Sequence, residues 1–155
     1  MIIVSDSGPL AYLFEIGIVN SLPIIYGEVY VPPVVLAELL DNHCPAANWA
    51  SHPPEWLTIA QPQSIPAGLL LDEGERDAIA LAIELGADLL LIDERKGRAA
   101  AKSHSLRVAG TLAVILDGAQ RGLFDGLTAL DKLESTNFYA SAELLQAVRD
   151  KLAQP

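Results

Sequence analysis

Apolar and polar positions follow two different periods along this chain. Short apolar runs ended by a carboxylate, a glycine or a proline predict strands over residues 1–6, 28–32, 56–62, 87–93 and 107–110. Apolar residues spaced three and four apart predict helices over residues 7–27, 33–42, 71–86, 95–106, 111–123 and about 141–152. Strands that alternate with helices in this way indicate an α/β fold with a mostly parallel sheet.

Breaks in the pattern set the expected limits of these elements. Pro23 should interrupt the first helical region, and Gly86 should end the long helix before it. Residues 43–55 read as a loop with a short helical turn near residues 46–51, and residues 124–140 read as a linker. A chain of 155 residues is expected to form one domain, spanning 1–155.

The composition is unusually apolar, with 51% hydrophobic residues and a mean hydropathy of +0.31. A sheet buried on both faces would explain this, and so would a membrane span. No apolar run approaches the roughly 20 residues that a span needs, and the N-terminal segment has no basic region typical of a signal peptide. We therefore expect no membrane association. The single cysteine, Cys44, excludes an intrachain disulfide and fits a cytoplasmic location.

Charge is distributed unevenly. The formal net charge is −10, and residues 1–75 contain nine acidic residues but no Lys or Arg. Five of the ten basic residues fall between Arg95 and Arg107. This balance excludes a global electrostatic footprint for nucleic acid, but it leaves room for one local basic patch.

Four acidic side chains are candidates for a shared site. Asp6 and Asp93 end two predicted strands, and the carboxyl ends of parallel strands meet at one edge of a sheet, where ligands bind. Glu75 begins the helix stripe 75, 79, 82, 83 and 86, which should pack on the sheet. Glu38 lies in the apolar helix 33–42. Each has a simpler alternative: a helix cap for the aspartates, dipole stabilisation for Glu75 and a solvated helix face for Glu38.

Four carboxylates at one edge would repel one another and raise their own pKa values, a penalty that a bound Mg²⁺ or Mn²⁺ would remove. Such a site can activate water and stabilise an in-line phosphoryl displacement. The basic residues that follow Asp93 could then hold a phosphate backbone; they are Arg95, Lys96, Arg98 and Lys102. Alternatively, these cations pair with nearby acids such as Glu94 or only solvate a helix.

The segments "VSDSGPL", "VYVPPVVLAELL", "LDEGERDAIALAIELGADLLLIDERKGRAAA" and "RVAGTLAVIL" resemble the PIN-domain family of metal-dependent ribonucleases over nearly the whole chain. Much of that family looks like the toxin half of VapC-type toxin–antitoxin pairs. The resemblance implies a flavodoxin-like, three-layer α/β/α sandwich and endonucleolytic cleavage of RNA with Mg²⁺ or Mn²⁺. It also implies a homodimer and, for a toxin, an antitoxin partner.

Carried over residue by residue, the resemblance makes Asp6, Glu38, Glu75 and Asp93 the catalytic and metal-binding acids. Ser7 and Thr111 match supporting hydroxyl groups. Glu94 stands where many relatives have a second aspartate.

Two other functional classes remain open from the residues. One is a non-catalytic module that binds RNA or protein on the same scaffold, a reading that the strong acidity favours. The other is a phosphohydrolase or phosphoacceptor that uses Asp6, which would be favoured by a second acid beside it. Ser5 and Ser7 flank Asp6 instead.

Overall fold

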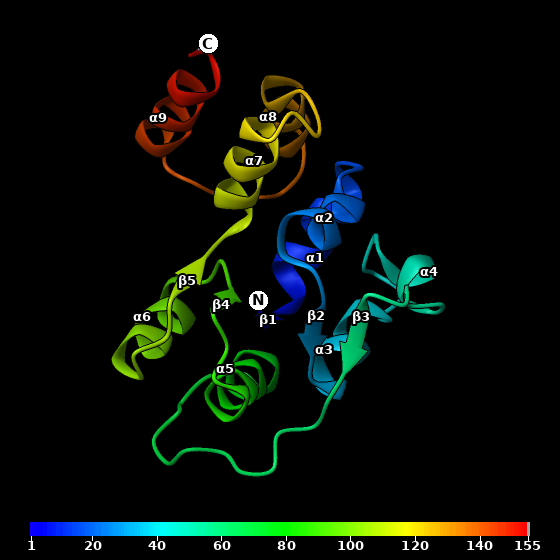
Figure 1. Ribbon diagram of the computed structural model, residues 1–155, viewed down its shortest axis with the longest axis vertical. Coiled ribbons are helices and arrows are strands. Elements are labelled where there is room, and N and C mark those ends of the chain that lie inside the picture. Colours follow the sequence, from blue (N-terminus) through cyan, green and yellow to red (C-terminus); the bar gives the residue numbers. More distant parts are fainter. Residues whose placement is uncertain (155) are drawn as a thin grey trace.

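A parallel sheet of five strands organises the computed structural model, which describes residues 1–154 (Figure 1). The strand order is β3-β2-β1-β4-β5, and every neighbouring pair is parallel. The strands are β1 (Ile3–Ser5), β2 (Val29–Val31), β3 (Leu57–Ile59), β4 (Leu89–Leu91) and β5 (Val108–Ala109). In the centre, Ile3 of β1 is in register with Val29 of β2 and Leu89 of β4. The predicted α/β fold is confirmed, and all pairings in the sheet are parallel.

Helices connect the strands and cover both faces of the sheet. They are α1 (Ser7–Glu15), the 3₁₀ turn η1 (Val19–Ser21), α2 (Leu22–Tyr26), α3 (Pro33–Leu39), α4 (Ala47–Ala50), α5 (Glu73–Leu85), α6 (Arg95–Ser103), α7 (Thr111–Gln120), α8 (Gly126–Glu134) and α9 (Ala142–Leu152). Gly86 ends α5 in the left-handed conformation, with φ 60°, as predicted.

Alternate strand residues enter different cores, which makes the three-layer sandwich visible in the packing. Ile3 and Leu91 join the core shared with α1, α2 and α3, whereas Val4 and Leu90 join the core shared with α5 and α6. Strands buried on both faces account for the continuous apolar runs that predicted them.

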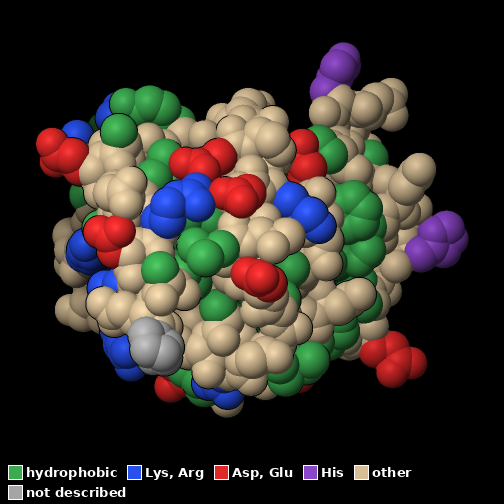
Figure 2. Space-filling model, turned by 90° about the horizontal axis from the view of Figure 1, so that it is seen from above, with side chains coloured by type: hydrophobic (Ala, Val, Ile, Leu, Met, Phe, Trp, Pro, Cys, Tyr) green, Lys and Arg blue, Asp and Glu red, His purple; other side chains and the backbone are tan. Residues whose placement is uncertain are grey.

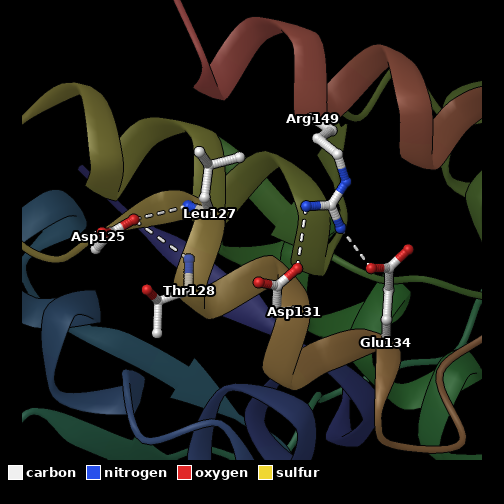
Figure 3. A network of polar contacts seen from close by, with 6 residues as sticks. All are labelled: Asp125, Leu127, Thr128, Asp131, Glu134 and Arg149. Atoms are coloured by element: carbon white, nitrogen blue, oxygen red, sulfur yellow. Dashed lines mark hydrogen bonds and ion pairs between the residues drawn. The ribbon is translucent and has the colours of Figure 1, made fainter.

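A third core lies among α7, α8 and α9, which stand together at one end of the molecule (Figure 1). Arg149 of α9 forms ion pairs with Asp131 and Glu134 of α8, and the carboxylate of Asp125 accepts hydrogen bonds from the first turn of α8 (Figure 3). Figure 2 views the molecule from the end at which α9 lies and shows acidic, basic and hydrophobic side chains interspersed there. The ion pairs of Arg149 and the shared apolar core fix α9 against α7 and α8.

The prediction of a linker over residues 124–140 was wrong, because α8 occupies much of this segment. Asp125 caps its first turn, and Leu130 and Leu133 are buried between α7 and α9. A nine-residue helix is marginal by itself in water, so the packing of its apolar face supplies most of its stability.

Two finer expectations about helices also differ from the structure. Gly17, with φ 83°, separates α1 from the following turn, while Pro23 lies in the first turn of α2, where a missing N–H breaks no hydrogen bond. On α5, Ile83 is 38% exposed, although it was placed on the sheet-facing stripe. Ile79 and Ala82 of that stripe are buried as expected, and Ala78 joins them in the core.

No single helix in the described part of the chain is long and apolar enough to cross a membrane. The pair Ser7–Glu15 and Val19–Tyr26 would suffice by length and composition alone, but it is bent by 115°. Several of its apolar residues, including Leu10, Leu13 and Leu22, are buried in the core, whereas Ile24 is 64% exposed.

The packing of α8 predicts a measurable loss of stability. Leu130→Ala should lower the free energy of unfolding by about 2–5 kcal/mol, because the leucine is fully buried and its removal leaves a cavity. Urea unfolding measures this effect. Leu70→Ala is the control, since Leu70 is 91% exposed and its loss should change stability by no more than about 0.5 kcal/mol. Equal effects of the two substitutions would contradict a core role for α8.

Candidate active site

The carboxyl ends of the two central strands bring Asp6 and Asp93 to the same edge of the sheet. Asp6 directly follows β1, and its N–H donates to the carbonyl of Leu91 at 2.9 Å, which extends the β1–β4 ladder. Asp93 follows β4 by two residues. Asp6 is buried and Asp93 is half-buried. Strand order therefore creates the core of the site, as expected from the positions of the two acids.

Thr111 fixes the carboxylate of Asp93. The Thr111 N–H donates to Oδ1 at 2.8 Å, and its hydroxyl donates to Oδ2 at 2.7 Å. Thr111 is fully buried as the first residue of α7. Burial nevertheless raises the pKa of Asp93, although both Thr111 bonds and the nearby Arg98 oppose the rise. A β-carbon on Gly110 would lie 2.6 Å from Oδ1, so only glycine leaves room for this carboxylate.

Glu38 approaches the site from α3, at its more exposed side. Its Oε1 accepts a hydrogen bond from the hydroxyl of Ser7 at 2.9 Å. Partial burial raises the pKa of Glu38, and Asp72 and Glu73 add to the rise. Gly74 faces the same carboxylate so closely that a β-carbon there would overlap it. The N-terminal turn of α5 is thereby in contact with the acid on α3.

Glu75 is the most constrained of the four acids. It is 8% exposed, and its Oε2 is buried without a hydrogen-bond partner within residues 1–154. A β-carbon on Gly97 of α6 would lie 2.6 Å from that oxygen. Burial, followed by the neighbouring Asp72, Asp6 and Glu94, raises the pKa of Glu75 to about 8.

Asp72 belongs to the same cluster, although it was not among the predicted site residues. Its carboxylate caps α5 by accepting from the N–H of Glu75 at 2.9 Å. It also acts electrostatically on Asp6, Glu38 and Glu75. Its position three residues before Glu75, where an aspartate caps a helix, was the available signal.

Asp6 lies at the electrostatic centre of this group. Its pKa is raised to about 7, mainly by burial and further by the negative charges of Glu38, Asp72 and Asp93. The structure therefore brings all four predicted acids into one group whose charges act on one another. Within residues 1–154, however, no three His, Cys, Asp or Glu side chains converge closely enough to enclose a metal ion by themselves.

The predicted basic turn divides into two parts. Arg95 and Arg98 line a cavity that also contains Asp93, whereas Lys96 and Lys102 are exposed elsewhere on α6. Arg98 Nη1 donates to the carbonyl of Ile92 at 3.1 Å, so this guanidinium is already partly engaged by the protein. None of these four cations forms an ion pair with an acid of the described chain. Glu94 is exposed at the start of α6, and its side chain makes no capping hydrogen bond.

Comparisons with known proteins agree with this fold. The family model DUF3368, described as a PIN domain, matches residues 2–154. Among solved structures, the chain is similar to a PilT N-terminus domain protein, SSO1118, from the hyperthermophilic archaeon Sulfolobus solfataricus P2. The TM-score is 0.51 at 14% sequence identity, and the match covers 90% of this chain and 100% of the other. No individually curated protein matches the sequence.

The chain therefore belongs to the PIN-domain family, whose members are typically nucleases and generally bind divalent metals. The structural similarity to SSO1118 supports the fold alone, because the two sequences are so divergent.

The raised pKa values predict that the metal-free protein loses stability as the pH rises. Between about pH 4 and 8, the folded chain holds protons on Asp6 and Glu75 that the unfolded chain has released, so alkaline pH favours unfolding. Urea unfolding in EDTA should give a lower free energy at pH 8 than at pH 5. Asp6 alone can contribute at most about 3 kcal/mol to this difference, because only the folded chain keeps its proton between pH 5 and its pKa of about 7.

Asp6→Asn should reduce this pH dependence, because asparagine carries no proton equilibrium in this range. The exposed Glu143→Gln is the matched control and should behave like the parent. A parent protein that is equally or more stable at pH 8 would show that the acids are stabilised by pairing rather than strained by burial.

Proposed function

We propose that this protein is a Mg²⁺- or Mn²⁺-dependent endoribonuclease in which Asp6, Glu38, Glu75 and Asp93 are the catalytic and metal-binding acids. The observation that carries the proposal is the buried Oε2 of Glu75, which has no hydrogen-bond partner within residues 1–154. It belongs to a group of carboxyl groups whose pKa values are raised by burial and mutual repulsion. Such an arrangement is costly in the protein alone and favourable around a cation.

The available donor atoms suit a hard divalent cation. They are carboxylate oxygens, with no thiolate or imidazole among the four acids. Because no three side chains within residues 1–154 enclose an ion, the arrangement fits Mg²⁺-like binding in which one or two of the four carboxylates contact the ion directly and the others act through its bound water. When bound, the ion would supply Lewis-acid stabilisation of the phosphodiester and activation of a water molecule.

The surrounding residues orient the acids for this role. The two hydrogen bonds from Thr111 hold both oxygens of Asp93 in one orientation, and the hydroxyl of Ser7 holds Glu38. Asp72 fixes the first turn of α5 and hence the backbone of Glu75. Pre-organisation of this kind reduces the rearrangement needed when substrate binds.

The basic residues of α6 would position the RNA backbone. Arg95, Lys96 and Lys102 are exposed and make no ion pair with the described chain, so they remain available for phosphate groups. Arg98 lies beside Asp93 but is partly engaged by the carbonyl of Ile92. Contacts to phosphate carry little sequence information, so this surface would select RNA by charge.

The finer parts of the proposal extend the family resemblance. We assign this nuclease to the toxin half of a toxin–antitoxin pair, acting as a homodimer in the cytoplasm, where the free Cys44 would remain reduced. A small DNA-binding protein encoded immediately upstream would support the assignment. The non-catalytic alternative keeps metal and RNA binding without cleavage, and the experiment that follows separates the two.

Cleavage of a labelled single-stranded RNA should require Mg²⁺ or Mn²⁺ and should stop in EDTA. Asp6→Asn and Asp93→Asn should each lower the rate by at least about 100-fold, the scale expected when a group that stabilises the transition state is removed. Asp125→Asn is the matched control, because asparagine also caps helices and Asp125 caps α8, outside the acidic group. Metal and RNA binding without cleavage would establish the non-catalytic module instead.

The contact between Gly97 and Glu75 gives a separate test of metal binding. Gly97→Ala should weaken Mn²⁺ binding by about 10-fold or more, because the added methyl group would lie 2.6 Å from Glu75 Oε2 and 2.5 Å from Ile92 Cδ1, so that the Glu75 carboxylate has to shift. Calorimetric titration measures the affinity, and urea unfolding checks that the variant is folded. Gly8→Ala is the control, since its β-carbon would only reach ordinary contact, 3.7 Å from Asp93. Parent-like Mn²⁺ affinity in Gly97→Ala would remove Glu75 from the metal site.

A further inference from the structure

A cavity of about 870 Å³ opens directly beside Asp93. One wall comes from the start of α6, from β5 and from α7, and the other comes from residues 137–151, which include α9. Its interior is largely aliphatic, with Val108, Leu112, Leu116 and Val148 among the lining residues. Asp93 therefore lies at the border between a charged site and an apolar hollow large enough for a nucleobase with its sugar.

An unusually exposed aromatic side chain borders this cavity. Tyr139 lies in the segment between α8 and α9, lines the cavity and is 89% exposed. The ring of its neighbour Phe138 already packs edge-on against Tyr12, with ring centroids 5.1 Å apart. Tyr139 takes part in none of the aromatic pairs of the described chain. A planar ligand in the cavity would cover its ring.

Basic residues distinguish this cavity from a second one that Tyr12 also lines. The large cavity is lined by three basic residues, Arg95, Arg98 and Lys151, and by two acidic ones, Asp93 and Glu94. The second cavity, of about 490 Å³, has no Lys or Arg in its described lining but does contain Glu38 and Glu15.

Tyr12 and Asn137 separate the two hollows. They line both cavities, and the Tyr12 hydroxyl donates to Asn137 Oδ1 at 2.9 Å. Each cavity also contains one of the predicted catalytic acids, Asp93 in the large one and Glu38 in the small one. A polyanion that crosses the acidic group is thus attracted on one side only, where Arg95 and Lys151 are exposed.

We propose that the large cavity is a nucleotide-binding subsite that holds one unpaired RNA nucleotide adjacent to the cleaved phosphodiester. The base stacks on Tyr139, and the phosphate of that nucleotide lies towards Arg95 and Lys151. This inference rests on the proposed ribonuclease function and adds to it the side chains that hold one base and its phosphate beside the acidic group. Stacking on an aromatic ring tolerates any base, so the subsite selects for an unpaired nucleotide rather than for a sequence.

Steady-state cleavage of a short single-stranded RNA tests the subsite with Tyr139→Ala, Tyr139→Phe and the remote control Leu70→Ala. Tyr139→Ala should raise KM by about 10-fold, within the range that one base–aromatic stack contributes, while kcat stays within about twofold. Tyr139→Phe should restore the parent KM, because it keeps the ring. Leu70→Ala should match the parent, although it also removes an exposed apolar side chain.

A substrate carrying one abasic nucleotide adds a second, independent readout. At one position near the cleavage site, loss of the base should raise KM for the parent and have no further effect in Tyr139→Ala. The same variants are compared in a fluorescence anisotropy titration with labelled RNA, which still reports on the subsite if the protein binds RNA without cleaving it.

Three results would overturn the subsite and leave the ribonuclease function in place. One is RNA cleavage by the parent with an unchanged KM in Tyr139→Ala. Another is a lower kcat at constant KM, which would indicate a displaced acidic group. The third is a lower molecular mass of Tyr139→Ala in light scattering with unchanged RNA affinity, which would assign this face to contact with a protein. A parent protein that neither binds nor cleaves RNA would instead overturn the proposed function.

Discussion

Burial of like charges at one edge of a parallel sheet is the constraint on which the rest of this structure depends. β1 and β4 are neighbours and run in the same direction, so Asp6 and Asp93 emerge side by side. The helices α3 and α5 then add Glu38 and Glu75 to the same edge. Burial raises the pKa of each of these groups, and their mutual repulsion raises the pKa values of Asp6 and Glu75 further. Without a cation, the fold holds these carboxylates together against their mutual repulsion.

The surroundings of the acids are shaped to permit that crowding. Gly74, Gly97 and Gly110 lie against the carboxylates of Glu38, Glu75 and Asp93, and a side chain at any of them would collide with its acid. The hydroxyl groups of Ser7 and Thr111 donate hydrogen bonds to Glu38 and Asp93. The sequence pairs "GE", "KG" and "GT" around these positions are therefore parts of one site, although they lie far apart along the chain.

The C-terminal helices connect this site to its surroundings. α7 provides Thr111 to the acidic group and, with α9, forms walls of the cavity beside Asp93. The ion pairs between Arg149 and α8 hold α9 in that position. The C-terminal region thus supplies much of the apolar lining of that cavity and one of its three basic residues, Lys151.

The sequence by itself determined the fold class, the parallel sheet and the edge at which Asp6 and Asp93 meet, because strand periodicity and element order are local properties. It also indicated Glu38 and Glu75, since an acid in an apolar helix or at its buried end is conspicuous. It could not reveal α8, which depends on packing against α7 and α9, nor the displacement of Ile83 from the buried face of α5. Only the tertiary structure placed Asp72 among the acids, set the glycines against the carboxylates and left Glu75 Oε2 without a hydrogen-bond partner within residues 1–154. Each of these features depends on contacts between residues far apart in the chain, and such contacts are set by how the helices pack on the sheet.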